Sequence, residues 1–143
     1  MAVIPLSELI SKDKLLQLRV LIVDDMPSMC LLIKQYLRSH EAVIVVGEAL
    51  NGDEALRKAQ ESQPDVIIMD MSMPGLSGVE VARKIKNLLP NIYIYLCSAY
   101  ELKEFKDLHI DSPADGFIQK SSLKPELQEM IRRELGRKNM TKL

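Results

Sequence analysis

The chain has 143 residues, of which 47% are hydrophobic and 27% are charged, and this length and composition suit one folded domain with a single core. The net charge of -1 disfavours the basic field that draws proteins to nucleic acid or to an anionic membrane. No apolar run approaches the roughly 18 residues that span a bilayer, and the first ten residues lack the pattern of a secretory signal. We therefore expect a cytoplasmic protein that binds no membrane and, through this chain, no nucleic acid.

The cysteines and histidines predict neither a disulfide nor a zinc site. Cys30 and Cys97 each lie in an apolar segment, which is typical of small, buried, reduced side chains. His40 and His109 have no cysteine or histidine partner at the spacing of zinc ligands.

Short β-branched runs alternate with longer helical patterns along most of the chain. Five runs predict strands, at residues 19–23, 42–46, 66–69, 92–96 and 116–118. Helix signals lie between and after them: Pro27 in a first turn, the capping-box patterns Asn51-x-x-Glu54 and Ser77-x-x-Glu80, and Pro125 before a helical run. We expect a helix after each strand, with Leu31, Leu32, Tyr36 and Leu37 sharing the apolar face of the first.

This alternation predicts the fold class. Strands that are apolar throughout must be covered on both faces, and strand-helix-strand crossovers of this length imply parallel pairing. We therefore expect an α/β fold with a doubly wound, five-stranded parallel sheet and helices on both faces, formed by residues 19–138. Residues 1–18 are expected to be an N-terminal extension, either a short amphipathic helix or a frayed segment, and residues 139–143 a C-terminal tail.

Polar side chains follow the predicted strands at the sheet edge where ligands of doubly wound folds bind. Asp24 and Asp25 follow the first strand, Asp70 ends the third, Ser98 follows the fourth and Lys120 follows the fifth. A single acid after a strand is commonly a helix cap, but three carboxylates at one edge repel one another unless a cation compensates them. Such a set suits Mg²⁺, a carboxylate nucleophile for phosphorus, and a lysine and a hydroxyl that stabilise phosphoryl oxygens.

The motifs at these positions resemble those of a known family. They are Val23-Asp24-Asp25, the segment 66–78 with Met-Ser-Met-Pro-Gly after Asp70, Cys97-Ser98-Ala99, and Phe117-Ile-Gln-Lys120. Their order and spacing are similar to those of the receiver domain of two-component response regulators. The resemblance implies a flavodoxin-like strand order 2-1-3-4-5. It also implies a signalling phosphoacceptor, not an enzyme, whose partners are a sensor histidine kinase or phosphotransfer protein and a downstream output protein or domain.

The resemblance also implies roles for individual residues. Asp70 would be the phosphoacceptor, Asp24, Asp25, Asp70 and the Ser72 backbone carbonyl would hold Mg²⁺, Lys120 would bind the phosphoryl group, and Ser98 and Phe117 would form a switch pair. The chain departs from the common family pattern because Ser121, not proline, follows Lys120. The face of the fourth helix, fifth strand and fifth helix would contact a partner or a second copy through Tyr100, Phe105, Leu108 and Ile110.

Three alternatives share part of this pattern. Phosphatases of the haloacid-dehalogenase type also form an aspartyl phosphate, but their nucleophile lies in an Asp-x-Asp pattern on the first strand. A flavin or dinucleotide binder needs a Gly-rich or Ser/Thr-rich loop where this chain has Asp24-Asp25-Met26-Pro27. The third alternative keeps the receiver as the regulatory half of a longer DNA-binding regulator, because the segment 46–52 resembles receivers that are attached to helix-turn-helix domains.

Overall fold

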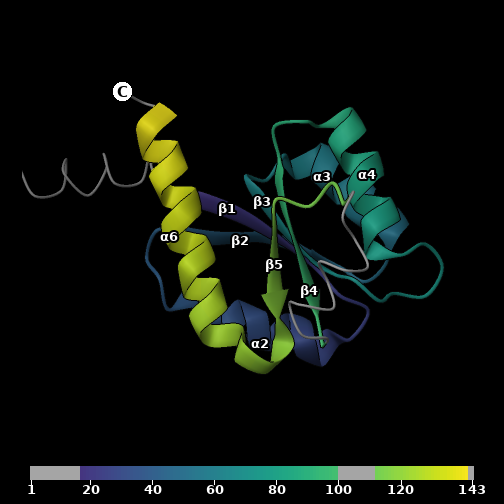
Figure 1. Cartoon of the computed structure of the whole chain (residues 1–143), viewed down its shortest axis with the longest axis horizontal. Helices are drawn as coiled ribbons and strands as arrows, with labels where there is room; N and C mark the ends of the chain where they lie inside the picture. The colour runs from purple at the N-terminus through teal and green to yellow at the C-terminus, as the bar shows by residue number, and fades with distance from the viewer. Residues whose placement is uncertain (1–16, 100–111, 142–143) are drawn as a thin grey trace, which may run out of the picture.

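The computed structural model describes residues 17–99 and 112–141, which form a five-stranded sheet flanked by helices (Figure 1). In chain order the elements are β1 (Leu18–Val23), α2 (Pro27–Arg38), β2 (Val43–Ala49), α3 (Gly52–Ser62), β3 (Val66–Asp70), α4 (Gly78–Leu88), β4 (Tyr93–Ser98), β5 (Gly116–Gln119), the 3₁₀ turn η1 (Lys120–Ser122) and α6 (Leu123–Thr141). The strand order β2-β1-β3-β4-β5, with every pair parallel, confirms the predicted doubly wound fold. The expected N-terminal helix and the expected fourth helix lie outside the described residues.

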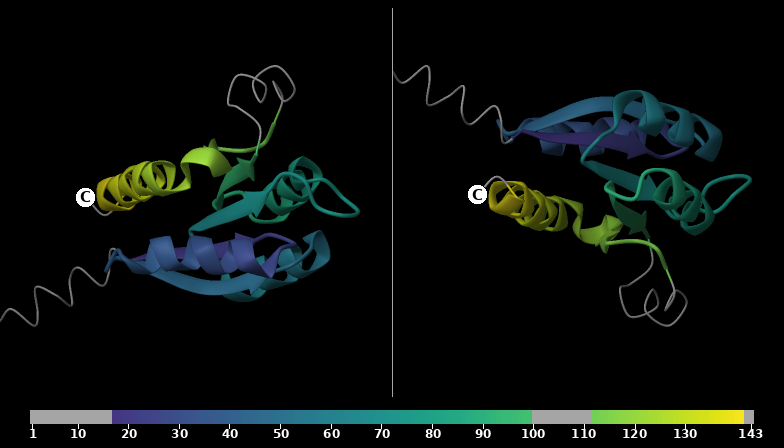
Figure 2. Two further views of the ribbon diagram at one scale, coloured as in Figure 1. Left: turned by 90° about the horizontal axis from the view of Figure 1, so that it is seen from below. Right: turned by 90° about the horizontal axis from the view of Figure 1, so that it is seen from above.

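The central strands β1 and β3 are almost entirely buried because both of their faces meet helices. One face of the sheet packs against α2 and α6 and the other against α3 and α4, as the views in Figures 1 and 2 agree. β1 and β3 pair from Val20 opposite Val66 to Val23 opposite Met69. Asp24 and Asp70 directly follow the last of these pairs, so they lie side by side at one edge of the sheet.

The helices begin at the predicted signals. Pro27 is the first residue of α2, where its missing N–H costs no hydrogen bond. Asn51 Oδ1 accepts a hydrogen bond from the Glu54 backbone N at 2.8 Å, and Ser77 Oγ accepts one from the Glu80 N at 3.3 Å. Each cap satisfies an N–H group that the first helical turn leaves unpaired. The two capping-box predictions are confirmed in their N-cap half.

The buried face of α2 differs from the predicted one. Cys30, Ile33 and Leu37 are buried, whereas Leu31 and Leu32 are 54% and 38% exposed. A helix of 3.6 residues per turn places positions 30, 33 and 37 on one line and turns the two leucines away from it. The placement of Leu31 and Leu32 on the same face as Leu37 was wrong, because it followed their hydrophobicity and not the helical phase.

Both cysteines are free and fully buried, as the sequence predicts. Burial raises the pKa of the Cys30 thiol to about 11 and that of the Cys97 thiol to about 12. Both thiols therefore remain protonated near neutral pH and act as small apolar side chains.

A buried polar contact joins β4 to α6. The Tyr95 hydroxyl donates a hydrogen bond to Oε2 of Glu134, a carboxylate that is 1% exposed and that also accepts from Nε of Arg137 at 3.3 Å. Gly116 lies opposite Tyr95 on β5, and a Cβ at this glycine would lie only 3.0 Å from the tyrosine ring. Because a buried carboxylate needs hydrogen-bond donors, this contact fixes α6 against the sheet.

We expect Tyr95→Phe to lower the free energy of unfolding by about 1–3 kcal/mol, because Glu134 stays buried and loses a donor. Tyr36→Phe is a matched control, since the Tyr36 hydroxyl makes no hydrogen bond within residues 17–99 and 112–141, and it should change stability by less than about 0.5 kcal/mol. Urea denaturation followed by circular dichroism measures both. Equal losses in the two variants would contradict the assignment.

Candidate functional site

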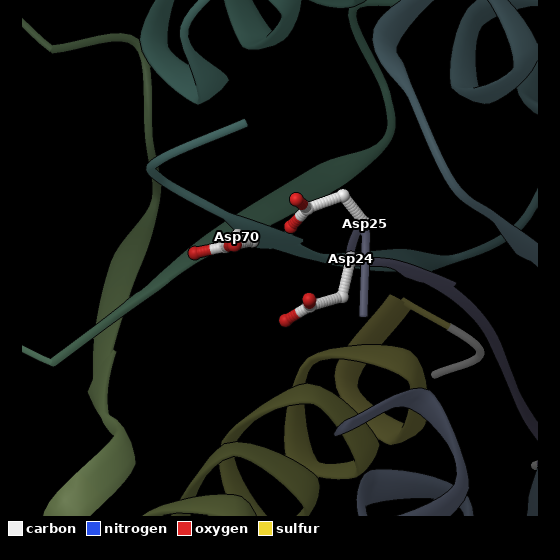
Figure 3. A group of neighbouring side chains, drawn as sticks. All are labelled: Asp24, Asp25 and Asp70. Atoms are coloured by element: carbon white, nitrogen blue, oxygen red, sulfur yellow. The ribbon is translucent and has the colours of Figure 1, made fainter. Parts of the chain in front are cut away.

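Three carboxylates meet at the carboxyl edge of the sheet, as the sequence predicts. Asp24 and Asp25 directly follow β1, and Asp70 is the last residue of β3. One carboxylate oxygen from each lies within 4.8 Å of the other two. Figure 3 shows the three groups beyond the ends of the two strands, turned toward the same side. The pairing of β1 with β3 imposes this proximity despite the repulsion between the charges.

The ammonium group of Lys120 reaches two of these carboxylates from the end of β5. Lys120 follows β5, and its Nζ lies 3.3 Å from Oδ2 of Asp24 and 3.3 Å from Oδ1 of Asp70. Burial opposes the charge of this ammonium, but Asp70 and Asp24 outweigh burial and raise the pKa of Lys120 above its ordinary value. Lys120 is therefore a cation that bridges the two aspartates.

Asp24 carries a carboxylate oxygen that the protein leaves incompletely paired. This side chain is 1% exposed, and its Oδ1 accepts a hydrogen bond from the Met26 backbone N at 2.9 Å. Its Oδ2 faces Lys120 but accepts no hydrogen bond from the described part of the chain. The ion pair with Lys120 leaves this buried oxygen room for a further ligand, and a divalent cation would supply one. The donor set offers oxygen atoms alone, which is the set Mg²⁺ prefers, so these residues fit that metal.

The charged form of Asp70 is disfavoured by its surroundings. It is 6% exposed, and burial, followed by the charge of Asp24, raises the pKa of its carboxyl group although Lys120 acts in the opposite direction. The Ser72 backbone N donates a hydrogen bond to Oδ1 at 3.3 Å. Any bound group that compensates the negative charge of Asp70 is therefore favoured at this position.

The turn after Asp70 is fixed to the sheet by its backbone. The Met71 N donates a hydrogen bond to the Cys97 carbonyl at 2.9 Å, and the Gly78 N donates one to the Met71 carbonyl at 3.0 Å. A Cβ on Gly78 would lie 2.4 Å from the carbonyl oxygen of Asp70, so α4 can begin this close only with glycine. This packing fixes the path of the backbone from Asp70 into α4.

The expected switch pair occupies neighbouring strands. Ser98 is the last residue of β4 and is 3% exposed, and its neighbour Cys97 pairs with Asp70, so Ser98 lies at the acidic edge. Phe117 lies on β5, opposite Leu96 of β4. Its half-buried ring packs against the core between the sheet and helices α3 and α4. The expected partner contacts Tyr100, Phe105, Leu108 and Ile110 lie outside the described residues.

One side chain near the site was not anticipated. Glu126, in the first turn of α6, accepts a hydrogen bond through Oε2 from the backbone N of Gln119, the residue before Lys120. An acid in the first turn of a helix is common, because it interacts favourably with the helix dipole. The sequence therefore gave no reason to connect Glu126 with the site.

We expect Asp70→Asn to raise the free energy of unfolding in metal-free buffer at neutral pH, because it removes a carboxylate whose charged form burial disfavours. Because the pKa of Asp70 is raised in the folded state, its charge destabilises the unmodified protein fully above that pKa and not at all below the ordinary value of 3.8. The extra stability of Asp70→Asn should therefore disappear as the pH falls through this range. Urea denaturation with a chelator measures it, with Asp53→Asn on the surface of α3 as the control. A less stable Asp70→Asn protein at neutral pH would contradict this interpretation.

Comparisons with known proteins identify the family of this fold and site. Residues 20–132 match the family described as "Response regulator receiver domain". The response regulator protein VraR of Staphylococcus saprophyticus is 34% identical over 116 residues, which are 81% of this chain and 56% of VraR. The chain belongs to the response regulator receiver domain family, which is a signalling family. It spans little more than half the length of VraR.

Two solved structures show the same fold. A LuxR-family two-component response regulator from Aurantimonas sp. SI85-9A1 superposes with a TM-score of 0.77 at 28% identity, covering 84% of this chain and 86% of that one. The response regulator TrrA of Thermotoga maritima, whose structure is a complex with Mg²⁺-BeF, superposes with a TM-score of 0.73 at 34% identity and covers 82% and 99%. These likenesses confirm the predicted resemblance to receiver domains.

Proposed function

We propose that this chain is a phosphoacceptor that takes a phosphoryl group onto Asp70 from a phosphohistidine of a sensor kinase or phosphotransfer protein. A carboxylate oxygen of Asp70 forms a bond to phosphorus, while the bond from phosphorus to the histidine nitrogen breaks and that nitrogen keeps the electron pair. The observation that carries the proposal is the position of Asp70, buried at a strand end beside Asp24 and the ammonium of Lys120.

We assign a Mg²⁺ site to Asp24, Asp25 and Asp70, with the backbone carbonyl of Ser72 as a further ligand. The incompletely paired Oδ2 of Asp24 and the oxygen-only donor set support this assignment. When bound, the metal would compensate negative charge on the phosphoryl oxygens. TrrA, which is 34% identical to this chain, was solved as a Mg²⁺-BeF complex, and this supports the assignment of a Mg²⁺ site.

The other proposed roles follow from charge and position. Lys120 stabilises the phosphoryl oxygens as a point charge, and the Ser98 hydroxyl donates a hydrogen bond to one of them. The buried site limits the access of water to the acyl phosphate, because Asp24, Asp70 and Ser98 are each less than a tenth exposed. We propose that the chain assists its own phosphorylation and dephosphorylation and is otherwise not an enzyme.

We expect one added phosphoryl group per chain, seen by intact-mass analysis, when the protein is treated with a small phosphodonor and Mg²⁺. Asp70→Asn should abolish the addition, because no other carboxylate of the cluster ends a strand beside Lys120, and a chelator should do the same. Asp53→Asn, an exposed acid on α3, should remain labelled. Labelling that persists in Asp70→Asn, or that is indifferent to the metal, would disprove the assignment.

We propose that the receiver domain comprises residues 19–138, with residues 1–18 as an extension and residues 139–143 as a tail. The family match over residues 20–132 supports these limits, although the burial of Leu18 extends the core by one residue. None of the described helices is long and apolar enough to cross a membrane. We propose a cytoplasmic role between a histidine kinase and a downstream output protein or domain.

We propose that Ser98 and Phe117 report phosphorylation. A phosphoryl group on Asp70 adds about two negative charges, which would draw the Ser98 hydroxyl inward and open space that the half-buried Phe117 ring can enter. The face of the expected fourth helix, β5 and α6 would then change for a partner or a second copy.

Backbone amide shifts, measured with and without beryllofluoride and Mg²⁺, test this switch. We expect changes near Asp24 and Asp70 and also along residues 98–120, and Ser98→Ala should confine them to the acidic site. Shifts that stay near the acids in the unmodified protein would rule out the switch.

A further inference from the structure

Lys120 is held by the least supported strand of the sheet. β5 has four residues and lies at the sheet edge, paired with β4 alone in the described part of the chain. The chain then enters η1 at Lys120, and Ser121 follows, so no proline ring restricts the backbone at this turn. The Lys120 Nζ nevertheless lies at the same distance, 3.3 Å, from Asp24 and Asp70. A further constraint on the backbone before Lys120 would therefore help to hold this placement.

Glu126 supplies such a constraint from α6. Its Oε2 accepts the hydrogen bond of the Gln119 backbone N, and Gln119 is both the last residue of β5 and the residue before Lys120. A carboxylate acceptor makes this bond roughly twice as strong as one between neutral groups. Leu127, the next residue, is 1% exposed in the core, so the helix turn that carries Glu126 is itself anchored.

We propose that Glu126 is a positioning residue for phosphotransfer, holding the end of β5 so that Lys120 can reach the carboxylates and the incoming phosphoryl oxygens. The proposal rests on the proposed function of Asp70. Glu126 does not belong to the carboxylate cluster, so its effect passes through the backbone of Gln119 to Lys120.

A stabilising role alone would have a different signature. An acid in the first turn of α6 also favours the helix through its dipole, and that effect depends on charge and not on reach. Glu126→Asp keeps the charge but is one methylene shorter, so it should lose the bond to Gln119. Glu126→Gln loses the charge but keeps an oxygen that can accept the same N–H.

The test measures the initial rate of phosphorylation by acetyl phosphate with Mg²⁺, followed by intact mass. We expect Glu126→Ala and Glu126→Asp to lower the rate about fivefold, and Glu126→Gln to keep about half of it or more. Glu129→Ala is the matched control, because Glu129 pairs with Arg132 on the exposed side of the same helix, and it should leave the rate unchanged. Urea denaturation verifies that each variant is folded in the assay.

A second series repeats Glu126→Ala in a Lys120→Ala background, where the added loss should be less than about twofold, since the two residues act along one path. A fivefold loss in both backgrounds would show a general structural role and overturn the proposal. The proposal would also be overturned if the rate depended on the charge of residue 126 alone, so that Glu126→Gln were as slow as Glu126→Ala and Glu126→Asp as fast as the unmodified protein. Labelling that is absent from the unmodified protein, or retained in Asp70→Asn, would instead disprove the function of Asp70.

Discussion

The contact of one ammonium group with two buried carboxylates is the interaction on which the site depends. Lys120 lies 3.3 Å from both Asp24 and Asp70, and Asp25 contributes a third carboxylate to the same cluster. Three carboxylates against one ammonium leave two negative charges in excess among these four side chains. Asp24 and Asp70 are buried, so their charges are poorly screened and must be held by the fold, whereas Asp25 is more exposed. A divalent cation, if bound here, would carry the charge that balances this excess.

The sheet holds these charges together because its centre is rigid. β1 and β3 lie between two apolar layers, and their pairing delivers Asp24 and Asp70 to neighbouring positions. Gly78 then lets α4 begin against the carbonyl of Asp70. The burial of many apolar side chains thus offsets the electrostatic cost of a few acids, at the sheet edge where doubly wound folds bind ligands.

Most of the fold and the positions of the site residues could be predicted, because strand patterns and strand-end residues are local signals. The prediction was poorer where the phase of an element decides the outcome: Leu31 and Leu32 point away from the core. β2 also runs on to Ala49, through Gly47 and Glu48, because β1 pairs with it beyond a register shift. A glycine and a glutamate favour strands only weakly, so pairing and not propensity extends β2.

Two contacts that the sequence did not reveal involve α6. Glu134 accepts a hydrogen bond from Tyr95, whose ring packs against Gly116, and Glu126 accepts one from the backbone N of Gln119, the residue before Lys120. Such pairs depend on how a helix lies on a sheet edge, which no local pattern encodes. The two aspartates come from the rigid centre, whereas their cation comes from a short edge strand supported by this helix. A change of charge at Asp70 would therefore act directly on Lys120, and through it on the end of β5, which pairs with β4 alone among the described strands.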